Sequence, residues 1–288
     1  HAFDYDYELI PDIGFQVIIK FFKSLGLPFT GMILAIGAVN YFAVLLLARH
    51  YSVSIGLLVI LWFLHIVVVR DFANLRSSLA ISIAIFGITA TSKKRTLGFY
   101  VGCISVHMSA AVFVLVYEAC KMVSKIRSVR CQWILILIGS AIITSIGLML
   151  PQLSFLDQRN ELYLNLHEDG YGNEVDSFGL LALHGLIVVL SIAFYRFWWG
   201  DQRLRALFYM ELVGIVSFIS LSGHAIFAFR LTNLILSLYP VLLLSIVKGI
   251  GLKRNRYVGL MSILFLWLFS LALILRPGSS EILNRILL

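Results

Sequence analysis

Residues 30–48 read TGMILAIGAVNYFAVLLLA, a run of apolar and small side chains without a charge. A membrane-spanning helix needs about 17–25 such residues, because the hydrocarbon core of a bilayer is about 30 Å thick. Blocks of similar length follow at residues 52–69, 132–150, 178–195, 206–222, 231–247 and 257–275. The pattern predicts an all-α, polytopic integral membrane protein with about 8–10 membrane segments, forming one domain over residues 1–288.

The composition supports this fold class and excludes several functions. Only 13% of the residues are charged, whereas a soluble domain has about a quarter. The net charge of +8 does not indicate nucleic acid as a partner, because the basic residues lie in short loops between apolar blocks. The cysteines form no CxxC pair and lie near no histidine at ligand spacing, so we expect them to be small apolar residues of the core. The sequence has no metal-ligand cluster and no nucleotide-binding glycine pattern, so we expect no metal and no cofactor.

The N-terminal region is predicted to lie at the membrane surface. Residues 13–25 read IGFQVIIKFFKSL, with apolar positions at helical spacing and polar positions on the other side. This pattern is typical of an amphipathic helix in the membrane interface. Because the sequence begins with His1 rather than Met, we expect a first membrane helix before residue 1.

The charges of the loops predict the orientation in the membrane. Basic loops, such as residues 93–95 and 121–130, are expected on the cytoplasmic side, and the acidic loop at 151–177 on the outer side. The acids, amides and aromatic rings of that loop suit a sugar, although an ordinary solvated loop has a similar composition. Residues 96–120 lie between two basic loops and are too few for two full spans. A re-entrant hairpin broken near His107 fits the charges, and a single span with a basic outer loop is the alternative.

In this topology polar side chains gather on the outer side of the membrane. They are Arg70, Arg76, Arg159, Arg230 and His224, with His107 directed toward them from the middle of its segment. Charged and imidazole side chains at membrane depth are costly, so they often mark a functional site. The planar guanidinium of Arg76 can bind two oxygens of a substrate phosphate. The alternative is that this side chain only extends to the phosphates of membrane lipids. His107 suits a general base or a hydrogen-bond donor, unless it is a hydrogen-bonded core residue.

Other ionisable residues are predicted to be structural. Glu118 can pair with the neighbouring basic loop, and Glu211 can pair with Arg203 or Arg205 if it lies near the inner end of its span. His184 lies inside an apolar block without a second polar group at helical spacing, which indicates a core histidine.

Four segments together resemble a known family. They are PDIGFQVIIKFF (11–22), RSSLAISIAIF (76–86), KKRTLGFYVGCISVHMSAAVF (93–113) and FRLTNLILSLYP (229–240). They resemble the EpsG/Wzy-type bacterial polysaccharide polymerases, which combine an acidic-x-Gly-aromatic motif, an arginine before a small-residue helix, a histidine before Ser-Ala and a late arginine. The chain departs from the pattern at Asp12, where the family more often has Glu, and at Val106, where it usually has Phe.

The resemblance implies a membrane glycosyltransferase with a GT-C-like helical bundle in the bacterial inner membrane. Such enzymes move a growing glycan from its undecaprenyl diphosphate carrier onto a new lipid-linked repeat unit, at a site that faces the periplasm. The implied partners are the lipid-linked oligosaccharide donor and acceptor, membrane lipid, a chain-length regulator and a flippase. The resemblance implies no nucleotide sugar and no obligatory metal.

The resemblance also implies roles for individual residues. Arg76 and Arg230 would bind the diphosphate, with Arg70, Arg159 and His224 as further candidates for diphosphate or glycan binding. The acceptor hydroxyl needs a base, and His107 or Asp12 could serve. Two other functions remain open. A transporter or flippase of lipid-linked sugars would use the same arginines without making a bond, and a non-catalytic membrane scaffold would use them as lipid anchors.

Overall fold

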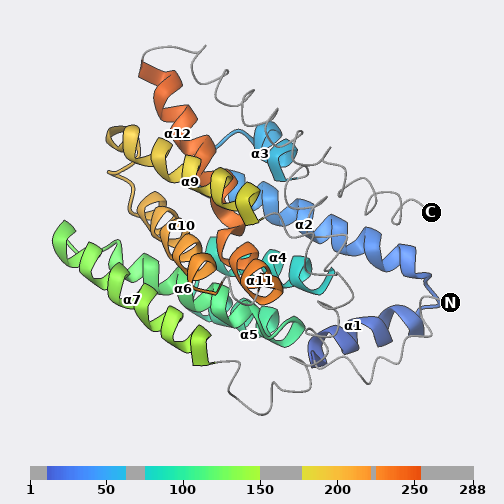
Figure 1. The fold of residues 1–288 in the computed structure, drawn as a ribbon. Coiled ribbons are helices and arrows are strands. Elements are labelled where there is room, and N and C mark those ends of the chain that lie inside the picture. Colours follow the sequence, from blue (N-terminus) through green and yellow to red (C-terminus); the bar gives the residue numbers. More distant parts are fainter. Residues whose placement is uncertain (1–11, 63–74, 150–176, 222–224, 254–288) are drawn as a thin grey trace. The chain divides into compact units, whose positions relative to one another are not determined.

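The computed structural model describes residues 12–62, 75–149, 177–221 and 225–253, and in these ranges the regular structure is helical (Figure 1). The all-α prediction is therefore confirmed for this part of the chain. Its residues form two compact units, the first ending at Val114 and the second beginning at Leu115. The helices of the first unit are α1 (Ile13–Ser24), α2 (Phe29–Tyr51), α3 (Ile55–Trp62), α4 (Leu75–Thr89) and α5 (Lys93–Val106). Helix α6 (Ala110–Val123) contains the boundary, and α7 (Val129–Met149), α9 (Ser177–Ala193), α10 (Gln202–Ser220), α11 (Ala225–Ile235) and α12 (Tyr239–Lys253) follow.

Several apolar helices are consistent with a membrane protein. Within the described ranges, Phe29–Tyr51 and Leu231–Gly249 are long and apolar enough to cross a bilayer. Shorter apolar helices cover Leu75–Thr89, Val129–Ser145 and Leu181–Ala193. Four of these five segments overlap blocks that the sequence predicts, and Leu75–Thr89 overlaps none of them. The block at 257–275 lies outside the described residues.

The predicted span at 231–247 is not one continuous α-helix. Helix α11 ends at Ile235, a 3-10 turn covers Leu236–Leu238, and α12 begins at Tyr239. Pro240 is the second residue of α12. Because proline has no backbone N–H, it cannot continue the α-helical hydrogen-bond ladder at this position. The apolar composition predicted the block correctly but does not register this local change.

In the first unit, α4 lies beside α2 and α5 (Figure 1). The side-chain amide of Asn40, on α2, donates to Ser78 Oγ on α4 at 2.5 Å, and the Ser82 hydroxyl donates to Asn40 Oδ1 at 2.6 Å. All three side chains are buried. Hydrogen bonds between helices and small interface residues are typical of helix packing in membranes, where the hydrophobic effect does not drive association. This contact fixes α4, whose first turn carries Arg76.

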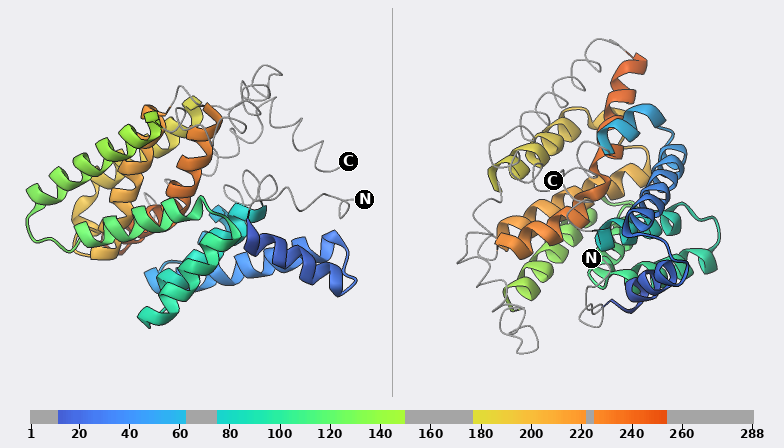
Figure 2. Two further views of the ribbon diagram at one scale, coloured as in Figure 1. Left: turned by 90° about the horizontal axis from the view of Figure 1, so that it is seen from below. Right: turned by 90° about the vertical axis from the view of Figure 1, so that its right-hand side faces the viewer.

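The second unit is built around α10, which packs against α7 and α9 (Figures 1 and 2). The hydroxyl of Tyr209, on α10, hydrogen-bonds the side-chain oxygen of Gln132 on α7. In the first turn of α10, Arg205 donates to the carbonyl oxygens of Trp199 at 2.7 Å and Ser124 at 2.9 Å. Polar side chains therefore join α10 to α7 and to the end of α6.

Glu211 has a different partner from the one that the sequence suggested. Its Oε1 lies 2.5 Å from Nδ1 of His184 on α9, and the two side chains are only 2% and 4% exposed. Helical neighbours lie three or four positions apart, and Arg205 and Arg203 lie six and eight positions before Glu211. The partner comes instead from another helix, which spacing within one segment cannot reveal. Glu118 pairs with Lys121, whose Nζ lies 2.9 Å from its Oε1, but the structure places Lys121 in the last turn of α6 rather than in a loop.

The buried pair between α9 and α10 generates a stability prediction. Replacing His184 with Ala should destabilise the fold by about 3–5 kcal/mol, because the Glu211 carboxylate would stay buried without its partner. The double variant His184→Leu, Glu211→Leu removes both polar groups and should unfold close to the wild-type temperature. Thermal unfolding of the purified protein in detergent, followed by circular dichroism, measures both variants. An unchanged melting temperature for the single variant would contradict the prediction.

Candidate active site

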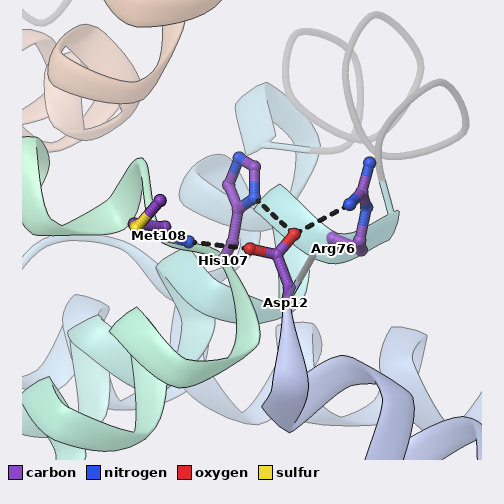
Figure 3. Close-up of polar contacts among 4 residues, drawn as sticks. All are labelled: Asp12, Arg76, His107 and Met108. Atoms are coloured by element: carbon purple, nitrogen blue, oxygen red, sulfur yellow. Dashed lines mark hydrogen bonds and ion pairs between the residues drawn. The ribbon is translucent and has the colours of Figure 1, made fainter. Parts of the chain in front are cut away.

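The structure brings three of the predicted site residues together around one carboxylate. Oδ2 of Asp12 lies 2.7 Å from an Nη atom of Arg76 and 3.3 Å from Nδ1 of His107. The other oxygen, Oδ1, accepts the backbone N–H of Met108 at 3.1 Å. Figure 3 shows the carboxylate between the guanidinium and the imidazole, with dashed lines to both. The site therefore joins α1, α4 and the segment between α5 and α6.

Asp12 is placed by the start of α1. It is the N-cap residue, with extended backbone angles of φ −90° and ψ 96°, and its carbonyl accepts the first hydrogen bonds of the helix from Phe15 and Gln16. An N-cap aspartate usually bonds its own helix through the side chain. Here no such bond forms, and the carboxylate turns instead toward Arg76, His107 and Met108. The side chain at the N-cap position thus binds the other site residues instead of the first backbone N–H groups of α1.

Gly14 allows α1 to reach the site. A Cβ atom added at this glycine would lie 2.7 Å from the carbonyl carbon of Ser105 and 2.8 Å from its oxygen. Such distances are sterically forbidden, and backbone atoms cannot move aside as a flexible side chain can. Ser105 lies two residues before His107. The acidic-x-Gly pattern therefore has a geometric reason, because the glycine permits the close approach and the acid spans the remaining distance.

A break between two helices positions His107. Helix α5 ends at Val106, and His107 has extended angles of φ −154° and ψ 110° before α6 begins at Ala110. In a continuous helix the Met108 N–H would bond the carbonyl four residues earlier, but here it points to Asp12. The interruption that the loop charges predicted near His107 is thus present. The side of the membrane on which the two flanking loops lie stays a prediction.

Arg76 lies in the first turn of α4. A cation is disfavoured there by the helix dipole, so its placement is explained by Asp12 rather than by the helix. Its side chain is 37% exposed, compared with 20% for His107 and 6% for Asp12. The guanidinium and the imidazole are accordingly the parts of the site that a ligand can reach.

The surroundings of Asp12 favour its ionised form. Burial by itself raises the pKa of the carboxyl, but the hydrogen bonds from His107 and the Met108 N–H and the charges of His107 and Arg76 outweigh it. The pKa of Asp12 therefore lies below its ordinary value. An ionised carboxylate only accepts hydrogen bonds, so it needs donors on all sides, and the site supplies three.

The remaining predicted site residues are not brought to this carboxylate in the described part of the chain. Arg230 lies on α11, but the structure does not describe its side chain. Arg70, Arg159 and His224 lie outside the described residues, as does the loop at 151–177. Within the described ranges, no group of three or more His, Cys, Asp or Glu side chains could hold a metal ion. The sequence reading missed the Met108 N–H, because a backbone donor has no signature in residue type.

Comparison with known proteins supports the resemblance found in the sequence. The model of the EpsG family matches residues 1–284, which is nearly the whole chain. The chain belongs to the EpsG family. Membership in the EpsG family implies involvement in exopolysaccharide biosynthesis. Comparisons with curated proteins and with solved structures found no match.

The contact at Gly14 leads to a prediction about assembly of the site. Gly14→Ala should reduce polysaccharide production by at least about tenfold, because the methyl group would push α1 from Ser105 and move Asp12 by about an ångström. Gly26→Ala is unsuitable as a control, because Gly26 has a positive φ of 67°. Gly98→Ala is the matched control, since nothing lies within 4 Å of its added Cβ. Polysaccharide yield at equal protein level measures both, and equal yields would show that the close approach is not needed.

Proposed function

We propose that this EpsG-family chain is a membrane glycosyltransferase that polymerises repeat units linked to undecaprenyl diphosphate into a surface polysaccharide. The observation that supports it best is the meeting of Arg76 and His107 at one buried carboxylate. The reaction needs a cation that binds phosphate and a group that transfers a proton. A guanidinium suits the first need and an imidazole suits the second. The proposed reaction uses neither a metal nor a nucleotide.

The chemical step transfers a glycan between two lipid carriers. A hydroxyl oxygen of the acceptor sugar forms a bond to the anomeric carbon of the donor glycan. The bond from that carbon to the diphosphate oxygen breaks, and its electron pair leaves with undecaprenyl diphosphate. The hydroxyl proton passes to a base of the enzyme, for which His107 and Asp12 are the candidates. Proton transfer of this kind typically contributes 10²–10⁴-fold to a rate.

Arg76 is proposed to stabilise the leaving diphosphate. Negative charge grows on the bridging oxygen as the bond breaks. A fixed cation placed at this oxygen stabilises the transition state more than the ground state, in which this oxygen carries less charge. The Arg76 side chain is more than a third exposed, and a guanidinium is the planar group that matches two phosphate oxygens. Arg230 is proposed as a second cation for the same group.

The exposed face of α1 supports a site at the membrane surface. Ile13, Val17 and Phe21 recur every fourth residue and are 73%, 59% and 57% exposed, whereas Phe15 is buried. An apolar stripe of this kind suits the boundary between headgroups and acyl chains. Asp12 is the N-cap residue of this helix. A helix at that boundary would therefore place the site near the depth of lipid phosphates. We propose that this depth is on the outer face of the bacterial inner membrane.

The test of function replaces the two accessible site residues separately. Arg76→Ala and His107→Ala, in cells that lack the native copy, should each lower the amount of long-chain polysaccharide by about 10²-fold or more. Arg95→Ala is the matched control, since Arg95 is an exposed arginine near the other end of α5, and it should leave the polymer unchanged. Gel electrophoresis of the polysaccharide measures chain length. Unchanged long chains in both site variants would exclude the catalytic assignment.

A purified system separates polymerisation from transport. Protein in liposomes with lipid-linked repeat units as both donor and acceptor should form new glycosidic bonds and release undecaprenyl diphosphate. Movement of the lipid-linked sugar between leaflets without a new bond would indicate the transporter or flippase instead. The absence of both activities in a protein that restores polysaccharide synthesis in cells would indicate a scaffold.

The proposed hairpin between the basic loops is tested by labelling. In a variant whose exposed Cys131 is replaced by Ser and whose buried Cys103 and Cys120 are kept, a cysteine introduced by Lys94→Cys or by Lys125→Cys should be shielded from an impermeant thiol reagent added outside intact cells. Both should react once the membrane is permeabilised. Labelling of position 125 from outside would show that residues 96–120 form a single span.

A further inference from the structure

The proposed function leaves two candidates for the base, and the geometry of the site distinguishes them. We propose that Asp12 is a positioning residue that acts through His107, and that Nε2 of His107 takes the proton from the acceptor hydroxyl. The inference rests on the proposed function, because it assigns the proton transfer of the same reaction.

Asp12 is poorly placed to receive a proton from a substrate. Its side chain is 6% exposed, and its two oxygens already accept hydrogen bonds from Arg76, His107 and Met108. A general base must come within about 2.6–3.2 Å of the proton donor. Three donors leave about one of the four lone-pair sites of the carboxylate, and its small exposed fraction leaves little room for a sugar hydroxyl at that site. His107 is 20% exposed, so its ring is more accessible than the carboxylate.

The contact with Asp12 determines which nitrogen of His107 is available. The carboxylate is ionised and has no proton to give, so Nδ1 must carry the proton in the 3.3 Å contact. In the neutral imidazole, Nε2 then has the free lone pair. Figure 3 shows this second nitrogen on the side of the ring away from the carboxylate. The Asp12 contact thus sets both the tautomer and the direction of the ring.

The same carboxylate restrains the cation of the site. Arg76 binds the oxygen that also faces His107, so the charged groups facing the imidazole in the described ranges are Asp12 at the start of α1 and, across that carboxylate, Arg76 on α4. An asparagine at position 12 would offer one acceptor oxygen and one donor group to three donors. At least one of the three contacts would become a clash between donors. A glutamate would keep the charge and both acceptors on a side chain longer by one methylene.

A double-mutant cycle tests whether Asp12 acts through His107. The proteins are wild type, Asp12→Asn, His107→Gln and the double variant, each assayed for glycosidic bond formation in liposomes. Asp12→Asn alone should lower kcat on the order of 10²–10⁴-fold, as expected for loss of an orienting carboxylate, with a smaller change in KM. In the His107→Gln background, the same substitution should cost at least about tenfold less than it does in the wild-type background, because residues that act as a unit are not additive. The loss that remains is the part that Asp12 exerts through Arg76. A full additional loss would show that Asp12 acts independently, and would overturn the proposal.

The pH dependence and a conservative variant complete the test. The wild-type rate should fall on the acid side, because a protonated imidazole has no free lone pair at Nε2. This fall should persist in Asp12→Glu, which should retain at least about a tenth of the wild-type rate, and be absent in His107→Gln. If Asp12 were the base, the rate would fall only at a pH below the ordinary pKa of an aspartate, because the pKa of Asp12 is lowered. That fall in rate would persist in His107→Gln. A wild-type protein that makes no glycosidic bond would refute the proposed function itself, which is a distinct outcome.

Discussion

The carboxylate of Asp12 connects segments that lie 64 and 95 residues apart along the chain. It holds a guanidinium from the start of α4, and an imidazole and a backbone amide from the break between α5 and α6. None of the three donors is placed by its own helix alone, since Arg76 lies where the dipole disfavours it and His107 lies where a helix has stopped. The other features of the first unit can be understood as the means by which these ends are brought to one acid.

Two of these features reduce local helix stability. The Asp12 side chain does not cap α1, and a lost N-cap bond typically costs about 1 kcal/mol. The break at His107 interrupts the hydrogen-bond ladder between α5 and α6. The buried contacts of Asn40 with Ser78 and Ser82 act in the opposite direction by fixing α4 against α2. The site is therefore built from helix ends on a framework of packed helices, which is the usual way to hold irregular backbone inside a membrane protein.

Much of this arrangement could be predicted from sequence, for identifiable reasons. Apolar blocks predict helices because bilayer thickness sets their length, and α2 and α7 lie close to the predicted ranges. The conflict between basic loops predicted an interruption near His107, which the structure contains. Pairing between helices could not be predicted, because residue spacing carries no information on it. His184 with Glu211 is one example, and Asp12 with Arg76 is another, since the residues were singled out separately and their contact became visible only in three dimensions.

The break after α5 also affects how this family can be studied by mutation. One of the three donors to Asp12 is the main-chain N–H of Met108, which every substitution except proline preserves. A side-chain scan would therefore report Met108 as dispensable although its amide contributes to the site. The same holds for comparison of sequences, because a position whose role is carried by the peptide bond is free to vary. Part of the specificity of this site is thus encoded in chain path rather than in residue identity.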